Sequence, residues 1–173
     1  AGDINYAGID PEQVAKFKQM KKIKVYTVPS SGYQLLTYNL RKNGWEGLRN
    51  KQVRQALSMS INKQAVIDSI FLGFGDPAFS FIPKPSPWYT EEGVPKFGIG
   101  SLYNKAKAKQ MLLEAGYGVK KPDGTIAVQG KDGKPIKLTL ATNSGNKLRE
   151  DIAFLVKQEL ADIGIEVDIK LVP

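Results

Sequence analysis

The clearest pattern of hydrophobic and polar positions lies between Asn50 and Gly75. Apolar residues recur there about one helical turn apart in two successive segments. These residues are Val53, Leu57 and Ile61, then Ala65, Ile70 and Phe71. Asn62 stands between the segments, where its side chain can cap the second one, and Gly73 ends that segment. The pattern predicts two short amphipathic helices that make the largest helical contribution to the core.

The C-terminal part of the chain combines both kinds of period. Residues 136–142 and 166–172 place an apolar side chain at every second position, as half-buried strands do. Residues 146–163 lie between them and are predicted to form a helix. A strand, a helix and a second strand in this order predict a parallel pair with a right-handed crossover. This order favours an α/β fold.

Two further elements are expected in the middle of the chain. Residues 103–116 predict a helix that ends at Gly116. Its predicted buried side consists of Ala106, Met111, Leu112 and Ala115. Residues 121–135 contain two Asp-Gly pairs, which are typical turn residues, and predict an exposed hairpin.

The N-terminal 40 residues predict strands around one helix. Residues 1–9 indicate a short strand, and Asp10-Pro11 is typical of a helix start. Residues 24–40 contain two strand-like runs, separated by the hinge-like stretch 29–32. With the strands above, they give a mixed sheet of about five strands packed by helices. The chain is therefore divided into a segment of residues 1–40 and a body of residues 41–173.

Composition limits the chemistry that the protein can perform. The 173 residues suffice for one domain with its own core, and no apolar run approaches the ~20 residues of a membrane span. The sequence has no cysteine and no histidine, so it lacks thiolate and imidazole ligands and the residues for Ser-His or Cys-His catalysis. We predict that the protein is not an enzyme and uses neither a metal nor a cofactor.

The excess of basic over acidic residues leaves two interpretations open. The formal net charge is +8, and the lysines are spread along the sequence among acidic residues. A solvated basic surface is the simpler explanation. The alternative is a basic interaction module that binds nucleic acid or another anionic polymer. The interleaved aromatic and arginine residues of a nucleic-acid platform are absent from the sequence, so no nucleic-acid partner is expected.

The segment from Val53 to Pro83 resembles the signature of the extracellular solute-binding proteins of family 5. These proteins are the oligopeptide and dipeptide receptors of ABC importers. The matching residues are Val53, Arg54, Ala56, Leu57, Ile61, Ile67, Gly73, Gly75, Ala78 and Pro83. Ser60 and Asn62 stand where the family usually has alanine and aspartate. Residues 103–117 and 160–172 are also similar to phrases of the family.

The resemblance implies a fold, a function and a location. The fold would be a lobe of a type II periplasmic-binding-protein architecture, and the chain would be an incomplete second lobe of a longer protein. The function would be capture of oligopeptides or similar solutes by closure of two lobes, followed by delivery to an ABC permease in the membrane. The receptor would be a monomer in the periplasm or at the cell surface.

Six residues are candidates for contact with such a ligand. Ser31, Gly32, Tyr33 and Gln34 offer an aromatic face, an amide and backbone groups that suit a peptide. Asn143 lies just past a predicted parallel strand, at the end where open α/β sheets bind ligands. The resemblance implies the same place for Asn143. Phe81 is a candidate hydrophobic clamp. The structural alternatives are an ordinary tyrosine-rich strand and loop residues that cover the core.

Three other motifs favour structural interpretations. Arg54 could anchor a ligand carboxylate, but its position inside a helix favours a capping role beneath residues 39–49. Residues 73–78 formally match G-x-G-x-x-A, yet they end a helix instead of opening one, so a nucleotide site is not favoured. The two Asp-Gly pairs lack the twelve-residue pattern of a calcium loop.

Overall fold

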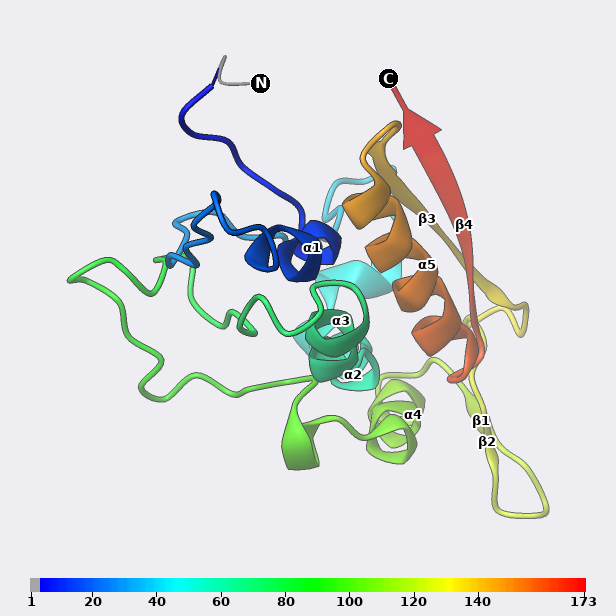
Figure 1. Cartoon of the computed structure of the whole chain (residues 1–173). Helices are drawn as coiled ribbons and strands as arrows, with labels where there is room; N and C mark the ends of the chain where they lie inside the picture. The colour runs from blue at the N-terminus through cyan, green and yellow to red at the C-terminus, as the bar shows by residue number, and fades with distance from the viewer. Residues whose placement is uncertain (1–3) are drawn as a thin grey trace.

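The computed structural model describes residues 4–173 and combines five α-helices with four strands among them (Figure 1). The helices are α1 (Val14–Lys18), α2 (Lys51–Ser60), α3 (Lys63–Ser69), α4 (Lys105–Glu114) and α5 (Lys147–Ala161). The strands are β1 (Val119–Lys120), β2 (Ile126–Ala127), β3 (Ile136–Asn143) and β4 (Ile165–Val172). Short 3-10 turns occupy Pro11–Gln13, Glu46–Arg49 and Gly100–Leu102.

Four helices begin in the same way, directly after an asparagine. The side-chain oxygens of Asn50, Asn62, Asn104 and Asn146 each accept a backbone N–H two or three residues further along, at 2.9 to 3.0 Å. Each bond satisfies an N–H group that has no partner inside its helix. The cap predicted at Asn62 is therefore confirmed.

The core forms where α2 meets α5 and the parallel strands. β3 and β4 pair in parallel from Ile136 opposite Ile165 to Asn143 opposite Val172. α5 joins these two strands and packs on both of them, and α4 packs beside α2 (Figure 1). The side chains that are almost completely buried include Val53, Leu57, Met59, Leu112, Ile163 and Ile165. Burial of such side chains is the main stabilising contribution.

The predicted pair of helices and the predicted strand–helix–strand unit are present, but only the first helix of the pair supplies fully buried residues to the core. α2 buries Val53 and Leu57, and Ile61 directly after it is also buried. α3 contains no fully buried residue among those described. In α4 the buried side is Ala108 and Leu112, and the expected Ala106 is exposed, because the residue one turn before Leu112 is the one that faces α2.

The prediction of strands in the N-terminal 40 residues is wrong. Residues 4–9 and 24–40 form no strand, and residues 1–3 of the expected first strand lie outside the described residues. The described residues hold two two-stranded sheets, β1–β2 and β3–β4, instead of one sheet of about five strands. A strand needs a partner for its backbone groups, and among the described residues no backbone hydrogen bond joins either run to β3 or β4. Most side chains from Val25 to Leu40 are exposed.

The two Asp-Gly pairs form turns, as predicted. Asp123 accepts the backbone N–H of Thr125 at 2.9 Å between β1 and β2, and Asp132 accepts that of Lys134 at 3.2 Å. Such side-chain bonds imitate a backbone turn. Within residues 4–173, no helix is both long and apolar enough to cross a membrane.

Candidate functional site

A shallow pocket of about 490 Å³ opens at the carboxyl end of β3, where the chain turns back into α5. Three stretches of chain line it, with one residue of β4. The lining residues are Tyr33, Gln34, Leu35, Ala141, Thr142, Asn143, Arg149 and Val172. The carboxyl end of parallel strands is where open α/β sheets bind ligands. We call this site the strand-end pocket.

Arg149 connects the walls of the strand-end pocket. Its Nε donates to Oε1 of Gln34 at 3.0 Å, and its Nη1 donates to Oδ1 of Asn143 at 2.8 Å. Gln34 comes from the segment before the helices and Asn143 from the end of β3, so one side chain joins residues far apart in the sequence. A guanidinium has only donors, so both amides must direct their oxygen atoms to it.

The loop between β3 and α5 holds Arg149 in place. Gly145 has a φ of 78°, which favours glycine, and its N–H donates to Oε1 of Glu150 at 2.9 Å. Asn146 then caps α5 by accepting the backbone N–H of Arg149 at 3.0 Å. The turn and the cap together place the arginine in the first turn of α5, beside the end of β3.

The structure brings three of the predicted residues together. Tyr33, Gln34 and Asn143 all line the strand-end pocket. Ser31 and Gly32 lie beside it in sequence but do not line it. Gly32 donates its N–H to Oγ of Ser30 at 3.0 Å, in a local turn. The ligand contacts of all five residues stay predictions.

Phe81 lies elsewhere, in the long connection between α3 and α4. Its side chain is 85% exposed and does not line the strand-end pocket. Phe79 is partly buried, with Nζ of Lys63 4.5 Å from its ring centroid. This cation–π contact holds Phe79 against the start of α3. The alternative of covering the core does not hold for the exposed Phe81, and its clamp role stays a prediction.

Arg149 was missed from the sequence, although one signal marks it. Its cationic side chain stands in the first turn of α5, where the helix macrodipole favours negative charge. This signal is weak, because Lys147 stands in the same turn. The hydrogen bond to Gln34 could not have been foreseen, because no periodicity links residues 115 positions apart.

Arg54 has a structural role, as the sequence favoured, and Tyr38 has one as well. Nη1 of Arg54 donates to the carbonyl oxygens of Leu48 at 2.8 Å and Arg49 at 3.1 Å, which satisfies the end of a 3-10 turn. The Tyr38 hydroxyl lies 3.2 Å from Oγ of Ser58. Burial raises the pKa of Tyr38, so it stays a neutral hydrogen-bonding group against α2.

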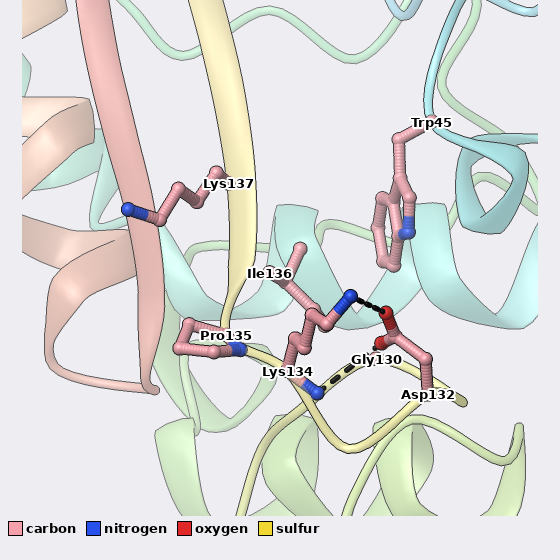
Figure 2. Close-up of a pocket in the computed structure, with 7 residues that line it drawn as sticks. All are labelled: Trp45, Gly130, Asp132, Lys134, Pro135, Ile136 and Lys137. Atoms are coloured by element: carbon pink, nitrogen blue, oxygen red, sulfur yellow. Dashed lines mark hydrogen bonds and ion pairs between the residues drawn. The ribbon is translucent and has the colours of Figure 1, made fainter.

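A second pocket of about 460 Å³ lies at the opposite, amino end of β3 (Figure 2). Trp45 forms one side, and Asp132 and Lys134 face it. The charged groups are paired: Lys134 Nζ lies 3.5 Å from Oδ2 of Asp132, and Lys137 Nζ lies 2.9 Å from Oε2 of Glu166. These charges are paired with opposite charges, whereas the side-chain partners of Arg149 are neutral amides, so the strand-end pocket is the better candidate.

The side chains of the strand-end pocket offer groups for hydrogen bonding. Its described lining residues carry amide, hydroxyl and guanidinium groups, and none carries a carboxylate, amine or imidazole that could act as a general base at neutral pH. Within residues 4–173, no group of three acidic residues gathers in a way that could hold a metal ion.

Comparison with known proteins identifies what the chain is similar to. The family described as bacterial extracellular solute-binding proteins, family 5 Middle, matches residues 1–173. The oligopeptide-binding protein AppA of Bacillus subtilis is 38% identical over 99% of this chain and 30% of its own length. The glutathione-binding protein GsiB of Salmonella choleraesuis is 29% identical over 97% of this chain and 28% of its own length.

A solved structure agrees with the sequence comparison. The structure of Bacillus subtilis AppA in complex with a nonapeptide superimposes with a TM-score of 0.79 and 37% identity, over 99% of this chain and 32% of that chain. The predicted fold class, a lobe of a periplasmic-binding-protein architecture, is confirmed. The chain spans about 30% of the length of the relatives that it matches.

Proposed function

This chain belongs to the bacterial extracellular solute-binding proteins of family 5, and we propose that it supplies one wall of a cleft that captures peptides or similar small solutes. The observation that carries the proposal is the joining of Gln34, Asn143 and Arg149 at the carboxyl end of β3. Relatives that match almost the whole chain are named for binding oligopeptides and glutathione.

The chemistry of the wall suits ligands with variable side chains. Amide groups and the face of Tyr33 can bind the repeating backbone of a peptide, which every sequence shares. Side-chain specificity then depends on few contacts. Ser31 and Gly32 extend this surface along the chain, with backbone groups that can join the same contacts.

The second wall is proposed to come from the additional length that the relatives possess. A cleft normally buries 70–90% of a small ligand, which requires protein on both sides. Closure of two lobes around a peptide would supply that burial, and the closed receptor would present its ligand to an ABC permease in the membrane. This function places the protein outside the cytoplasm, as a monomer, and makes it a carrier with no catalytic step.

Chemical-shift mapping tests the proposed site. The ¹⁵N-labelled chain is titrated with a pool of short peptides up to about 20 mM, a range that reveals millimolar affinity. We expect the shifted resonances to cluster at Gln34, Asn143 and Arg149. Shifts confined to the second pocket at Trp45, or no shifts at all, would contradict the proposal. The carrier role is tested by incubating the chain with the same peptides and looking for fragments. We expect none, and fragments would contradict the role.

The runner-up function, binding of nucleic acid through basic charge, makes a different prediction. It requires a mobility shift with duplex or single-stranded DNA near ~0.1 M salt that weakens steeply as salt increases. We expect no shift, because the lysines with ion-pair partners, such as Lys105, Lys131 and Lys137, are already partly neutralised. A salt-sensitive shift would favour the runner-up.

A further inference from the structure

The outer edge of β4 carries backbone groups that have no hydrogen-bond partner in the described part of the chain. β4 pairs with β3 alone in its sheet, and in Figure 1 it runs along one side of the molecule, with β3 and α5 on its inner side. The carbonyl oxygen of Val172 accepts the N–H of Ser144 at 2.7 Å, so the backbone of Val172 faces β3. Successive residues of a strand direct their backbone groups to opposite edges, so those of Val167, Ile169 and Leu171 face outward. An edge of this kind can pair with another strand.

The side chains of β4 leave two charges without an opposite charge among residues 4–173. Asp168 and Lys170 are both exposed, and neither has an ion-pair partner there. Glu166, on the same face of the strand, differs from them, because its Oε2 lies 2.9 Å from Nζ of Lys137. The other face of β4 is apolar and is incompletely covered at its carboxyl end, where Leu171 is 47% exposed. The strand therefore offers one free acid, one free base and an open apolar position beside its unpaired edge.

We propose that the outer edge of β4 pairs in antiparallel orientation with the same edge of a second copy of this chain. A two-fold axis through Ile169 places Asp168 of each copy directly opposite Lys170 of the other, so that each dimer gains two pairs of opposite charge. The same register places Val167 opposite Leu171 on the apolar face. The outward backbone groups of Ile169 bond to those of Ile169 in the second copy. β3 and β4 of both copies then form one sheet of four strands.

Charge favours this register over its two neighbours. Moving the axis one residue toward the amino end sets Asp168 against Asp168 of the second copy. Moving it one residue toward the carboxyl end sets Lys170 against Lys170. Like charges directly opposite each other destabilise a pair of strands. The axis through Ile169 avoids both repulsive pairs and keeps each apolar side chain opposite another apolar one.

The dimer is expected to be weak and to depend on concentration. One added ladder buries less surface than the roughly 1,600 Å² of a standard interface, and the net charge of +8 opposes association. We therefore expect a dissociation constant of about 0.1–1 mM at low salt. The dimer is an additional state of the chain, and the carrier proposed above acts as one copy.

Sedimentation equilibrium of the 173-residue chain, between about 20 μM and 1 mM, measures the dissociation constant. A mixture of differently labelled copies adds a test of the register. In that mixture we expect a nuclear Overhauser contact between the Hα of Asp168 in one copy and the Hα of Lys170 in the other, because antiparallel pairs without mutual hydrogen bonds bring these atoms close together. A chain that stays monomeric at 1 mM, or a dimer that lacks this contact, would overturn the proposal.

Reversal of the two charges assigns the dimer to this edge. Lys170→Asp should weaken the dimer about tenfold or more, as should Asp168→Lys, because each sets like charges opposite each other twice. The double variant, with both substitutions, restores opposite pairs and should restore the dimer. Lys157→Asp, at an exposed position of α5, changes the net charge as Lys170→Asp does and should keep the dimer.

The control matters because Lys170→Asp lowers the positive net charge, which by itself would favour association. Backbone amide spectra report that each variant stays folded. A dimer that survives both single reversals lies on another surface and contradicts the proposal, and so does a double variant that stays monomeric while folded.

Discussion

At the scale of single residues, Gly98 leaves no room for a side chain at a position that matters for the fold. Its φ is +86°, and a Cβ atom there would lie 2.4 Å from the carbonyl oxygen of Ile61 and 3.1 Å from that of Ser58. Its carbonyl oxygen also accepts the N–H of Lys63 at 3.0 Å. Gly98 thus fastens the long connection before α4 to the junction of α2 and α3.

We expect Gly98→Ala to lower the free energy of unfolding by more than about 2 kcal/mol, because left-handed strain adds to a backbone clash. Urea unfolding followed by circular dichroism measures the change. Gly93→Ala is the matched control: Gly93 has a φ of +69° but nothing within 4 Å of its Cβ position. It should cost only about 1 kcal/mol. Equal losses of stability in the two variants would mean that the backbone around Gly98 moves to make room for the added methyl group.

Residue chemistry explains which parts of the site could be predicted. Asn143 could be proposed because a strand end is a local feature of the sequence, and Gln34 because it is an amide beside a hinge-like stretch. Both line the pocket, and their ligand contacts stay predictions. Arg149 was not found, since its role depends on two partners that only the fold brings together. Phe81 was chosen for its aromatic ring, but sequence alone does not say that its side chain is 85% exposed.

At the scale of elements, the asparagine cap of α4 offers a clear test. Asn104 accepts the backbone N–H of Lys107 at 2.9 Å. Asn104→Ala should lower the free energy of unfolding by about 1 kcal/mol. Asn104→Asp should keep the full stability or exceed it, because a negative charge there favours both the helix dipole and the nearby Lys105. Thermal unfolding of the three proteins checks this order, and an unstable aspartate variant would contradict the capping role.

Lys105 connects α4 to the end of α5. Its Nζ lies 2.5 Å from Oδ2 of Asp162 and 3.3 Å from Oε1 of Glu159. Partial burial lowers the pKa of Lys105, but hydrogen bonds to Asp162, Tyr103 and Glu159 outweigh it and raise the pKa above the ordinary 10.5. A folded-state pKa above the unfolded value stabilises the fold at pH values below 10.5, and this contribution is lost as the pH rises further.

We therefore expect Lys105→Gln to lower the free energy of unfolding at pH 8, and the difference from the parent chain to shrink above pH 10.5. Urea unfolding at pH 8 and pH 11 measures both values. Lys107→Gln, at an exposed position of the same helix, should change the stability little at either pH. A Lys105 difference that stays constant with pH would mean that packing, not charge, connects the helices.

The elements also show where pattern reasoning fails. The strand–helix–strand unit of β3, α5 and β4 was predictable from local patterns. Apolar residues alternate in both strands and follow helical spacing in α5, and the two strands pair with each other. The runs within residues 24–40 have β-favouring side chains, but strand formation depends on a neighbour with free backbone groups. Although residues 33–35 lie near the end of β3, no backbone hydrogen bond joins them to it, and most side chains of the stretch are exposed. The division at residue 40 stays a prediction.

At the scale of the whole molecule, the shallow strand-end pocket limits affinity. A pocket open on one side leaves the polar groups of a peptide in water and buries little apolar surface. Association still costs several kcal/mol in lost translational and rotational freedom. The fold can thus position Gln34, Asn143 and Arg149 while ligand affinity stays low. One wall is enough to position these side chains, but burial of a ligand needs a wall on each side.

We expect the 173-residue chain to bind peptides with millimolar or weaker affinity, and a relative of full length to bind them with micromolar or tighter affinity, a difference of about 4 kcal/mol or more. Bacillus subtilis AppA, whose structure holds a nonapeptide, is the natural comparison. Titration calorimetry of both proteins with the same nonapeptide gives the two affinities, and competition NMR extends the range for the weaker one. Micromolar binding by the 173-residue chain would mean that the cleft is complete within it. The strand-end pocket would then be only part of the site, and a deeper contact surface, which could include Phe81, would have to supply the missing burial.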